Sequence, residues 1–305
     1  MGYGDYLLFT AVANNLKKQK NVKTRYIRKK IIVKDDTQLG QGKIIKNNPN
    51  FCQIKNLSKC HDVKNITREK HFYNLNVNEH QIIQMCKKAG LKNNILLKPE
   101  LYLLENEYKN VQKLLNNIKK PFIVLEPFSK KIRNEFFFIL QKLVKDFKDK
   151  IQLVQIGAPT TQYYGKFEKN KKNLTLKLNN EILTINGKLT IRETIYFLQQ
   201  SLCYIGIEGA LVHGLASDIF YKKNNKFIKI VNKSTGIVFI GGQMNPKSVM
   251  YPQFEYIILD PHKGKYCGKL GLRKKDKGKC EDCCKMFKKY EIEKIYDKID
   301  RLISK

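Results

Sequence analysis

Hydrophobic residues near the start of the chain recur at helical spacing. They stand at Leu7, Leu8, Ala11, Val12 and Leu16. Residues three or four positions apart lie on one face of a helix, and Asp5 stands where an N-cap belongs. The pattern therefore predicts a helix over residues 5–20. The same spacing predicts helices over 80–89, 105–118 and, at the end of the chain, 291–303.

After residue 121, short apolar runs of strand length alternate with helical segments. We expect strands over 122–125, 151–156 and 203–207 and within 228–240, and helices over 134–147, 192–201 and 210–217. In the first part of the chain, residues 24–33 have the pattern of a strand and 97–103 that of a connector. Regular alternation of strands and helices is typical of a parallel, doubly wound sheet.

In such a sheet, ligands bind beyond the carboxyl ends of the strands. Four loops are predicted to meet at that edge: 126–131, 157–161, 208–213 and 241–245. The stretch that contains Glu208 and His213 is the most informative of them, because a tight turn there carries a carboxylate and is followed by a helix with a histidine in its first turn. A helix N-terminus can also bind an anion such as phosphate.

The length of 305 residues is sufficient for two domains. No apolar run approaches the roughly eighteen residues that a membrane-spanning helix needs. The first residues lack the basic and apolar regions of a secretory signal, so a cytoplasmic location is expected. The chain contains no Walker-type phosphate loop and no Gly-x-Gly-x-x-Gly, which weighs against kinases, ATPases and nicotinamide enzymes.

The net charge of +32 admits two interpretations. A surface that binds a polyanion is one, because lysine and arginine dominate affinity for phosphates. The other is a compositional bias toward lysine, which is spread along the whole chain. Arginine, the residue favoured for bidentate recognition of phosphates and bases, occurs at only seven positions. We therefore do not expect nucleic acid as a partner, whereas peripheral contact with an anionic membrane surface remains an expectation.

The chain has eight cysteines, four of which lie close together near the end: Cys267, Cys280, Cys283 and Cys284. Zinc favours four thiolates, and a Cys-x2-Cys pair is its usual half-site. Because Cys267 stands alone in the first half, the spacing is not that of a standard zinc motif. These thiols are zinc candidates, and a packing or redox role is the favoured alternative.

Five short motifs stand in the order found in glycosyltransferase family 9. They are Gly4-Asp5 at the start of the first helix, Glu126-Pro127-x-Ser129-Lys130-Lys131, Gln155-Ile156-Gly157-Ala158, Arg192-Glu193-Thr194 and Gly206-x-Glu208-Gly209-Ala210-x-x-His213. On these motifs the chain resembles this family, the heptosyltransferase-like group, and the resemblance is strongest over residues 121–253.

The resemblance implies an α/β protein of the GT-B type, in which two Rossmann-like domains with parallel sheets face each other across a cleft. It implies an acceptor-binding domain over 1–118, a nucleotide-sugar-binding domain over 119–288, and a final helix, 289–305, that packs back on the first domain. Members transfer a sugar with inversion and require no metal or other cofactor. The expected partners are a nucleotide-diphosphate sugar and a glycan or lipid-linked acceptor.

An inverting transfer needs a carboxylate that takes the proton of the acceptor hydroxyl. By the resemblance Asp5 holds this position; its alternative role is a helix N-cap alone. The donor-binding positions implied by the resemblance are Ser129, Lys130, Lys131, Gly157, Glu208, Gly209, Ala210 and His213. Lys130 or Lys131 would neutralise the diphosphate, and Glu208 would accept hydrogen bonds from sugar or ribose hydroxyls. Glu208 as a helix cap and His213 as a core histidine remain alternatives.

The sequence departs from the family pattern at several positions. The usual Asp-Thr-Gly is Glu208-Gly209-Ala210 here, the usual Lys-x-Trp-Pro has lost its Trp and Pro, and no acidic residue follows Gly157 closely. Specificity for ADP-heptose is therefore not expected. So little sequence precedes Gly4 that the first strand of the N-terminal domain is expected to be missing. A non-catalytic polyanion- or nucleic-acid-binding protein on a degenerate GT-B scaffold is the alternative function.

Overall fold

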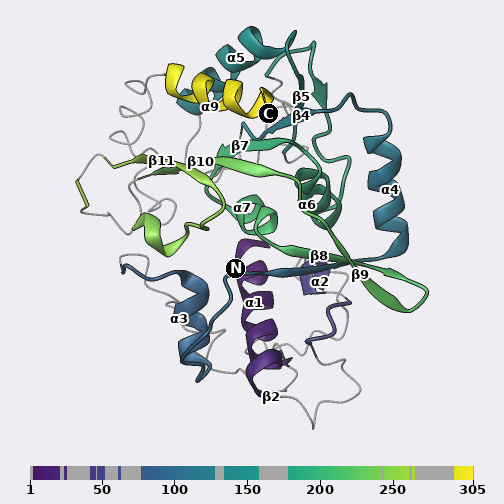
Figure 1. Ribbon diagram of the computed structural model, residues 1–305, viewed down its shortest axis with the longest axis vertical. Helices are drawn as coiled ribbons and strands as arrows, with labels where there is room; N and C mark the ends of the chain where they lie inside the picture. Colours follow the sequence, from purple (N-terminus) through teal and green to yellow (C-terminus); the bar gives the residue numbers. More distant parts are fainter. Residues whose placement is uncertain are drawn as a thin grey trace, which may run out of the picture.

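The computed structural model describes residues 3–20, 24–25, 42–45, 47–51, 61–62, 77–127, 134–157, 178–241, 244–260, 263–264 and 292–304. A six-stranded sheet lies at its centre (Figure 1). Its strands are β4 (Phe122–Leu125), β5 (Gln152–Gln155), β6 (Leu183–Thr184), β7 (Cys203–Ile207), β10 (Thr235–Gly241) and β11 (Glu255–Leu259).

All neighbouring strands of this sheet are parallel, in the order β11-β10-β7-β4-β5-β6. The chain enters at β4 in the middle, runs outward through β5 and β6, returns to β7 on the other side of β4, and runs outward again. This is the strand order of the doubly wound nucleotide-binding fold, and its switch point lies between β4 and β7. The predicted doubly wound sheet is thus confirmed.

Each face of the sheet is covered by its own helices. Successive residues of a strand point to opposite faces, and two separate hydrophobic clusters result. One face packs against α5 (Asn134–Phe147) and α9 (Glu293–Ile303), and the other against α6 (Ile191–Gln199) and α7 (Ala210–Leu215). The second cluster, which also includes residues of the N-terminal part, is called the larger core below.

The described part of the final helix packs beside α5. Tyr296 of α9 packs edge-on against Phe147 of α5, with ring centroids 5.0 Å apart, and donates a hydrogen bond to Asp146. Ile295 and Ile299 are buried in the cluster beneath α5. Within the described residues α9 therefore covers the C-terminal sheet, because its apolar stripe is used there rather than against the N-terminal part.

A second sheet joins distant segments of the chain. β3 (Glu100–Leu103) pairs in parallel with β8 (Asp218–Lys223), and β8 forms an antiparallel hairpin with β9 (Lys226–Ile230). The connector predicted over 97–103 is wrong, because its second half is β3, and the sequence pattern gives no prediction for 218–223. Neither strand is specified locally: β3 is buried on both faces and lacks an alternating pattern, and its partner lies more than a hundred residues away.

The N-terminal part is built around α1 (Tyr3–Lys20), which is buried from Tyr6 to Leu16. Its short neighbours are β1 (Thr24–Arg25), α2 (Gly42–Ile45), β2 (His61–Asp62) and α3 (Gln81–Lys88), with β1 and β2 paired in parallel. Polar groups of α1 bind the segment that leads into β3: Thr10 Oγ1 accepts a hydrogen bond of 2.8 Å from the Glu100 amide, and Asn15 Nδ2 donates one of 3.0 Å to the Leu96 carbonyl.

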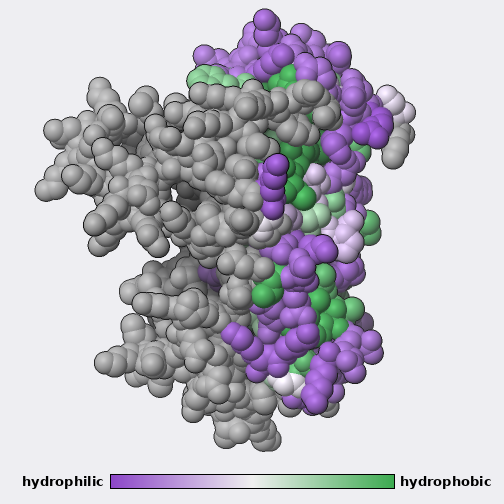
Figure 2. All heavy atoms as spheres, turned by 90° about the vertical axis from the view of Figure 1, so that its left-hand side faces the viewer, coloured by the Kyte–Doolittle hydropathy of each residue, from purple (hydrophilic) through white to green (hydrophobic). Residues whose placement is uncertain are grey.

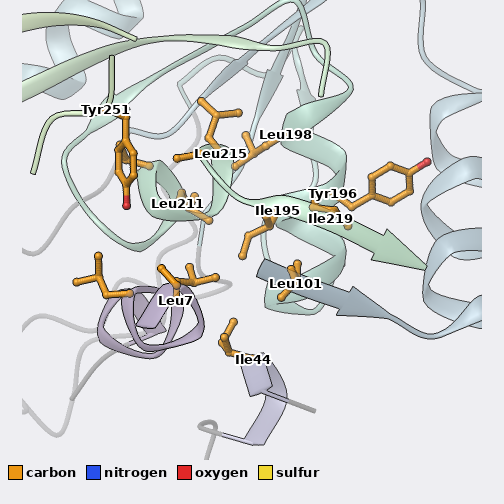
Figure 3. Close-up of a cluster of buried hydrophobic side chains, with 14 of the residues drawn as sticks. Leu7, Ile44, Leu101, Ile195, Tyr196, Leu198, Leu211, Leu215, Ile219 and Tyr251 are labelled. Atoms are coloured by element: carbon orange, nitrogen blue, oxygen red, sulfur yellow. The ribbon is translucent and has the colours of Figure 1, made fainter. Parts of the chain in front are cut away.

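The larger core joins the two halves of the chain. Figure 3 shows Leu7 of α1 below Leu211 of α7, with Ile44 and Leu101 on the side of α2 and β3. The two hydrophobic clusters are thus separated by the central sheet and not at residue 118, where the sequence predicts a domain boundary. That boundary stays a prediction about how the chain is organised, but no gap in the core marks it.

Arg192 at the start of α6 is buried and binds two segments of the chain. Its Nε donates a hydrogen bond of 3.1 Å to Glu107, its Nη2 also contacts that carboxylate, and its Nη1 donates one of 3.2 Å to the Tyr102 carbonyl. Glu193 closes a capping box with Thr190 at the start of α6. Through its contacts with Glu107 and Tyr102, Arg192 therefore ties α6 to α4 (Glu105–Leu115) and to β3.

The described part of the side shown in Figure 2 is mostly hydrophilic, with smaller hydrophobic patches between. Among the helices that the structure describes, none combines the length and the apolar character needed to cross a bilayer.

Candidate functional site

Two glutamates follow the two strands that flank the switch point of the sheet. Glu126 comes directly after β4 and Glu208 directly after β7, and the Glu126 amide donates a hydrogen bond of 3.0 Å to the Ile205 carbonyl. By strand alternation, both side chains lie on the face that carries α6 and α7. The carboxyl ends of adjacent parallel strands thus bring the two carboxyl groups to one place, where doubly wound folds bind their ligands.

The Glu126 carboxyl group accepts a hydrogen bond from the Tyr204 hydroxyl. Tyr204 lies on β7, two residues before Gly206, and its ring extends along the strand over that glycine. A Cβ at position 206 would lie 2.1 Å from the Tyr204 hydroxyl oxygen, so only glycine leaves room for the ring. Gly206 is therefore required for the contact between Tyr204 and Glu126.

Burial, with a smaller contribution from the nearby Glu208, raises the pKa of Glu126 to about 8 against the hydrogen bond from Tyr204, which acts in the opposite direction. A carboxyl group removed from water favours its neutral form, and a second carboxylate nearby adds to that preference. Glu126 is therefore protonated at neutral pH. Burial also raises the pKa of Tyr204 well above its usual value, so its phenol stays a hydrogen-bond donor.

His213 of α7 lies beside Glu208 and is fixed by a tyrosine. Its Nδ1 lies 2.8 Å from the Tyr251 hydroxyl, and its Nε2 lies 4.0 Å from Glu208 Oε1. All three side chains are buried. Burial, Tyr256 and Glu208 together raise the pKa of Tyr251 well above its usual value, so its phenol stays neutral and shares one hydrogen bond with Nδ1 of His213.

A second histidine connects this cluster to the N-terminal part. His80 packs edge-on against Tyr251, with ring centroids 4.8 Å apart, and its Nδ1 caps α3 by accepting a hydrogen bond of 3.1 Å from the Ile82 amide. Burial, with a smaller contribution from the neighbouring His213, lowers the pKa of His80 to about 3. His80 is therefore a neutral, structural group that holds Tyr251 from the side of α3.

The start of α1 lies directly against the start of α7. A Cβ on Gly4 would lie 3.2 Å from His213 Cδ2 and 3.4 Å from the Ala210 Cα. Gly4 and Asp5 are half-buried, as are Gly209 and Ala210. Asp5, the predicted base, is therefore the neighbour of Gly4, which packs against the predicted donor site at His213 and Ala210. At this point α1 and α7 are in direct contact.

The structure brings together one group of the predicted positions and leaves another undescribed. Asp5, Glu208, Gly209, Ala210 and His213 lie at the junction of α1 and α7. Gly157 lies at the end of β5, next to β4 in the sheet, and its φ of 156° is one that residues with a side chain rarely adopt. An added Cβ at Gly209 would meet only the Ile207 carbonyl, at 3.7 Å, so backbone space is open there.

The predicted positions Ser129, Lys130 and Lys131 lie outside the described residues, as do Cys267, Cys280, Cys283 and Cys284. Within the described ranges no cluster of His, Cys, Asp and Glu could hold a metal ion. The described part of the site is rich in carboxyl groups: Asp5, Glu126 and Glu208.

Sequence reasoning missed the polar groups that support this site. Glu126 stands in a loop that the pattern assigns to the ligand-binding edge, and a carboxyl group at the end of a buried strand is a signal that could have identified it. Tyr204 followed by Gly206 on a buried strand is a weaker one. Tyr251 and His80 carry no local signal, because Tyr251 meets His213 and His80 packs on Tyr251 only through the tertiary packing of distant segments.

Comparisons with known proteins support the fold. No protein-family model matches the sequence, and no curated protein matches it. The structure is similar to that of the glycosyl transferase family 9 protein from Veillonella parvula DSM 2008, with a TM-score of 0.56 and 11% identity over 99% of this chain and 94% of that chain. The structure also resembles that of ADP-heptose lps heptosyltransferase II of E. coli, with a lower TM-score of 0.43 and 11% identity over 74% of this chain and 62% of that chain. The chain therefore has the GT-B-like α/β fold of a glycosyltransferase family 9 structure, as the order of its motifs predicts.

Proposed function

We propose that this protein is a glycosyltransferase that moves a sugar from a nucleotide-diphosphate donor to a glycan or lipid-linked acceptor. The observation that carries the proposal is the position of Glu208 at the switch point of a doubly wound sheet, beside His213, which lies against Gly4 in the turn that bears Asp5. The likeness to a family 9 structure over nearly the whole chain supports it.

In this proposal Asp5 is the base that takes the proton of the acceptor hydroxyl, and the transfer inverts the anomeric centre without a metal ion. A positioned base of this kind contributes about 10²–10⁴-fold to the rate. Asp5 is half-buried on the first turn of α1, next to the Gly4 backbone that touches Ala210. A buried α1 gives that carboxylate a rigid support, which a base acting at a fixed distance requires.

The donor would lie over the carboxyl ends of β4, β5 and β7. Glu208 would accept hydrogen bonds from hydroxyl groups of the donor, and His213 would donate from Nε2 toward a phosphate oxygen. Gly157, Gly209 and Ala210 would let the ligand approach the backbone closely. Ser129 with Lys130 or Lys131 would bind the diphosphate and neutralise its charge. A cytoplasmic place at the periphery of a membrane fits an acceptor anchored in lipid.

Donor binding is tested first, by thermal shift with UDP, GDP, ADP, CMP and their common sugar conjugates. A ligand that binds the native state raises Tm by mass action. We expect one nucleotide diphosphate to raise Tm, Glu208→Gln to abolish that rise, and Asp149→Asn, an exposed acid on another part of the surface, to keep it. If no nucleotide changes Tm while DNA or heparin does so in a salt-sensitive manner, the polyanion-binding alternative replaces this proposal.

Catalysis is tested next, with the donor so identified. Asp5→Asn should lower kcat by about 10²–10⁴-fold with little change in donor affinity, because the base acts on the acceptor. Activity should survive EDTA, and the anomeric configuration of the product should be opposite to that of the donor. Full activity of Asp5→Asn would exclude this residue as the base.

A further inference from the structure

The β8–β9 hairpin projects from the body of the protein at the lower right of Figure 1. Its tip, Asn224-Asn225, has φ angles of 48° and 60°, the left-handed pair that a tight two-residue hairpin turn requires. The backbone from Lys222 to Lys229 is exposed. Beyond Tyr221 and Ile230, which pack against the larger core, the hairpin is therefore a solvent-facing arm.

Toward its tip the hairpin concentrates positive charge. Between residues 222 and 233 the sequence has five lysines and neither an acidic residue nor an arginine: Lys222, Lys223, Lys226, Lys229 and Lys233. Lys229 pairs with Asp218 at the base of the hairpin, with a distance of 2.9 Å. Within the described residues, Lys222, Lys226 and Lys233 have no acidic side chain at ion-pair distance.

Two of the lysines are placed unfavourably for the isolated protein. Lys223 and Lys226 are direct cross-strand partners on either side of the turn. Like charges directly opposite each other destabilise a hairpin. A local arrangement that opposes folding is expected where a sequence serves function, and an anionic surface against the tip would remove this repulsion.

Exposed apolar side chains stand among these lysines. Phe227, Ile228 and Val231 are 38%, 40% and 71% exposed, and they are three of the six exposed large hydrophobic residues in the described part of the chain. Lysines on an edge strand also discourage pairing with other chains, but that role gives no reason for exposed isoleucine and valine beside them. The combination of lysine and aliphatic residues points to a surface that is anionic outside and apolar beneath.

We propose that the β8–β9 hairpin binds an anionic phospholipid membrane. Lysines near such a surface are attracted by its negative potential, while aliphatic side chains enter the boundary between headgroups and acyl chains. Nucleic acid fits less well, since the arm has no arginine and its one exposed aromatic ring, Phe227, already packs edge-on against Tyr102. The proposal does not depend on the transferase function.

The test is flotation of the full-length protein with vesicles of phosphatidylcholine containing about 30% phosphatidylglycerol, compared with phosphatidylcholine alone. We expect binding to the anionic vesicles and little to the neutral ones. Lys222→Glu with Lys226→Glu should lower the partition coefficient by about tenfold or more. Ile228→Ser with Val231→Ser should lower it by about threefold or more at unchanged charge.

A matched control reverses two exposed lysines on α5, Lys142→Glu with Lys145→Glu, at a distant end of the molecule (Figure 1). It makes the same change in net charge and should have a much smaller effect. Thermal melts establish that each variant is folded. The proposal is overturned if the hairpin variants lose no more binding than the α5 control, or if the serine variant binds as well as the native protein. Binding of single-stranded DNA that depends on the same lysines, without hairpin-dependent vesicle binding, would assign the arm to nucleic acid instead.

Discussion

At the scale of single residues, Glu126 is a carboxyl group whose pKa is strongly raised by its burial. Its pKa of about 8 in the folded protein lies above the ordinary value of 4.5. Between these two pH values the folded state holds a proton that the unfolded state has released. The free energy of unfolding therefore falls as pH rises through this window. The contribution of Glu126 to this fall is about 1.4 kcal/mol per pH unit.

Replacement of Glu126 by Gln should remove this dependence. The amide oxygen can still accept the hydrogen bond of Tyr204, so we expect the variant to match the native protein near pH 5 and to exceed it in stability near pH 8. Urea unfolding at several pH values measures the difference between the two proteins. Glu181→Gln, which alters an exposed acid paired with Lys148, serves as the control. Parallel pH profiles for the native protein and Glu126→Gln would contradict the raised pKa.

Tyr251 is expected to fix the orientation of His213. Tyr251→Phe removes the hydroxyl that lies 2.8 Å from the buried Nδ1 and with it the hydrogen bond between the two side chains. We expect a loss of about 1 kcal/mol in unfolding free energy and a changed ¹⁵N shift of the His213 Nδ1. Tyr296→Phe, which removes a more exposed tyrosine–aspartate bond, should change neither the shift nor, appreciably, the stability. An unaltered His213 signal in Tyr251→Phe would exclude the positioning role.

How much of the site could be read from the sequence depends on how local its determinants are. Glu208 and His213 were predictable, because they occupy a strand end and the first turn of the helix that follows. Glu126 was only placed in the right loop. Tyr251 and His80 could not be found: Tyr251 meets His213 from about 40 residues away, His80 packs on Tyr251 from a still more distant segment, and nothing in their own neighbourhoods indicates these contacts.

At the scale of elements, the buried pair of Arg192 and Glu107 is the main electrostatic tie between α6 and α4. The two side chains are 5% and 12% exposed. Removing one partner from a buried pair leaves an uncompensated charge and costs about 3–5 kcal/mol. Glu107→Gln keeps an acceptor for the Leu104 amide, which the native carboxylate binds at 2.8 Å, and so isolates the effect of charge.

We expect Glu107→Gln to lower the unfolding free energy by about 3 kcal/mol. The neighbouring exposed pair, Glu105 with Lys109, provides the comparison: Glu105→Gln removes a similar contact in solvent and should cost well under 1 kcal/mol. Chemical denaturation of both variants gives the two values. Equal losses would mean that Arg192 finds another partner or reaches water in Glu107→Gln.

Elements with a strong internal pattern were predicted closely, and elements defined by distant partners were not. The range predicted for α5 matches the structure, and α1 and β7 are correct to within two residues. Strands β3 and β8 were missed because each becomes a strand through pairing with the other across the fold. Periodicity reports how a segment buries its own side chains, whereas such pairing depends on the whole topology.

At the scale of the whole molecule, the net charge of +32 is a property that no single contact offsets. Its 59 basic residues outnumber 27 acidic ones, and folding brings them closer together. Self-repulsion of this kind destabilises the compact state and is screened by salt, with a Debye length of about 10 Å at 0.1 M. The ion pairs described above are local and neutral in sum, so they leave the excess in place.

Raising NaCl from about 20 mM to about 300 mM should therefore increase Tm, and it should do so more than in an ordinary protein, because the screened term is repulsive overall. Differential scanning calorimetry at constant pH measures the change. Lys142→Glu with Lys145→Glu lowers the net charge by four, from +32 to +28, and should reduce both the repulsion and the response to salt. A Tm that falls with added salt would mean that attractive ion pairs outweigh the repulsion, which would require the lysines to be paired far more widely than the described residues show.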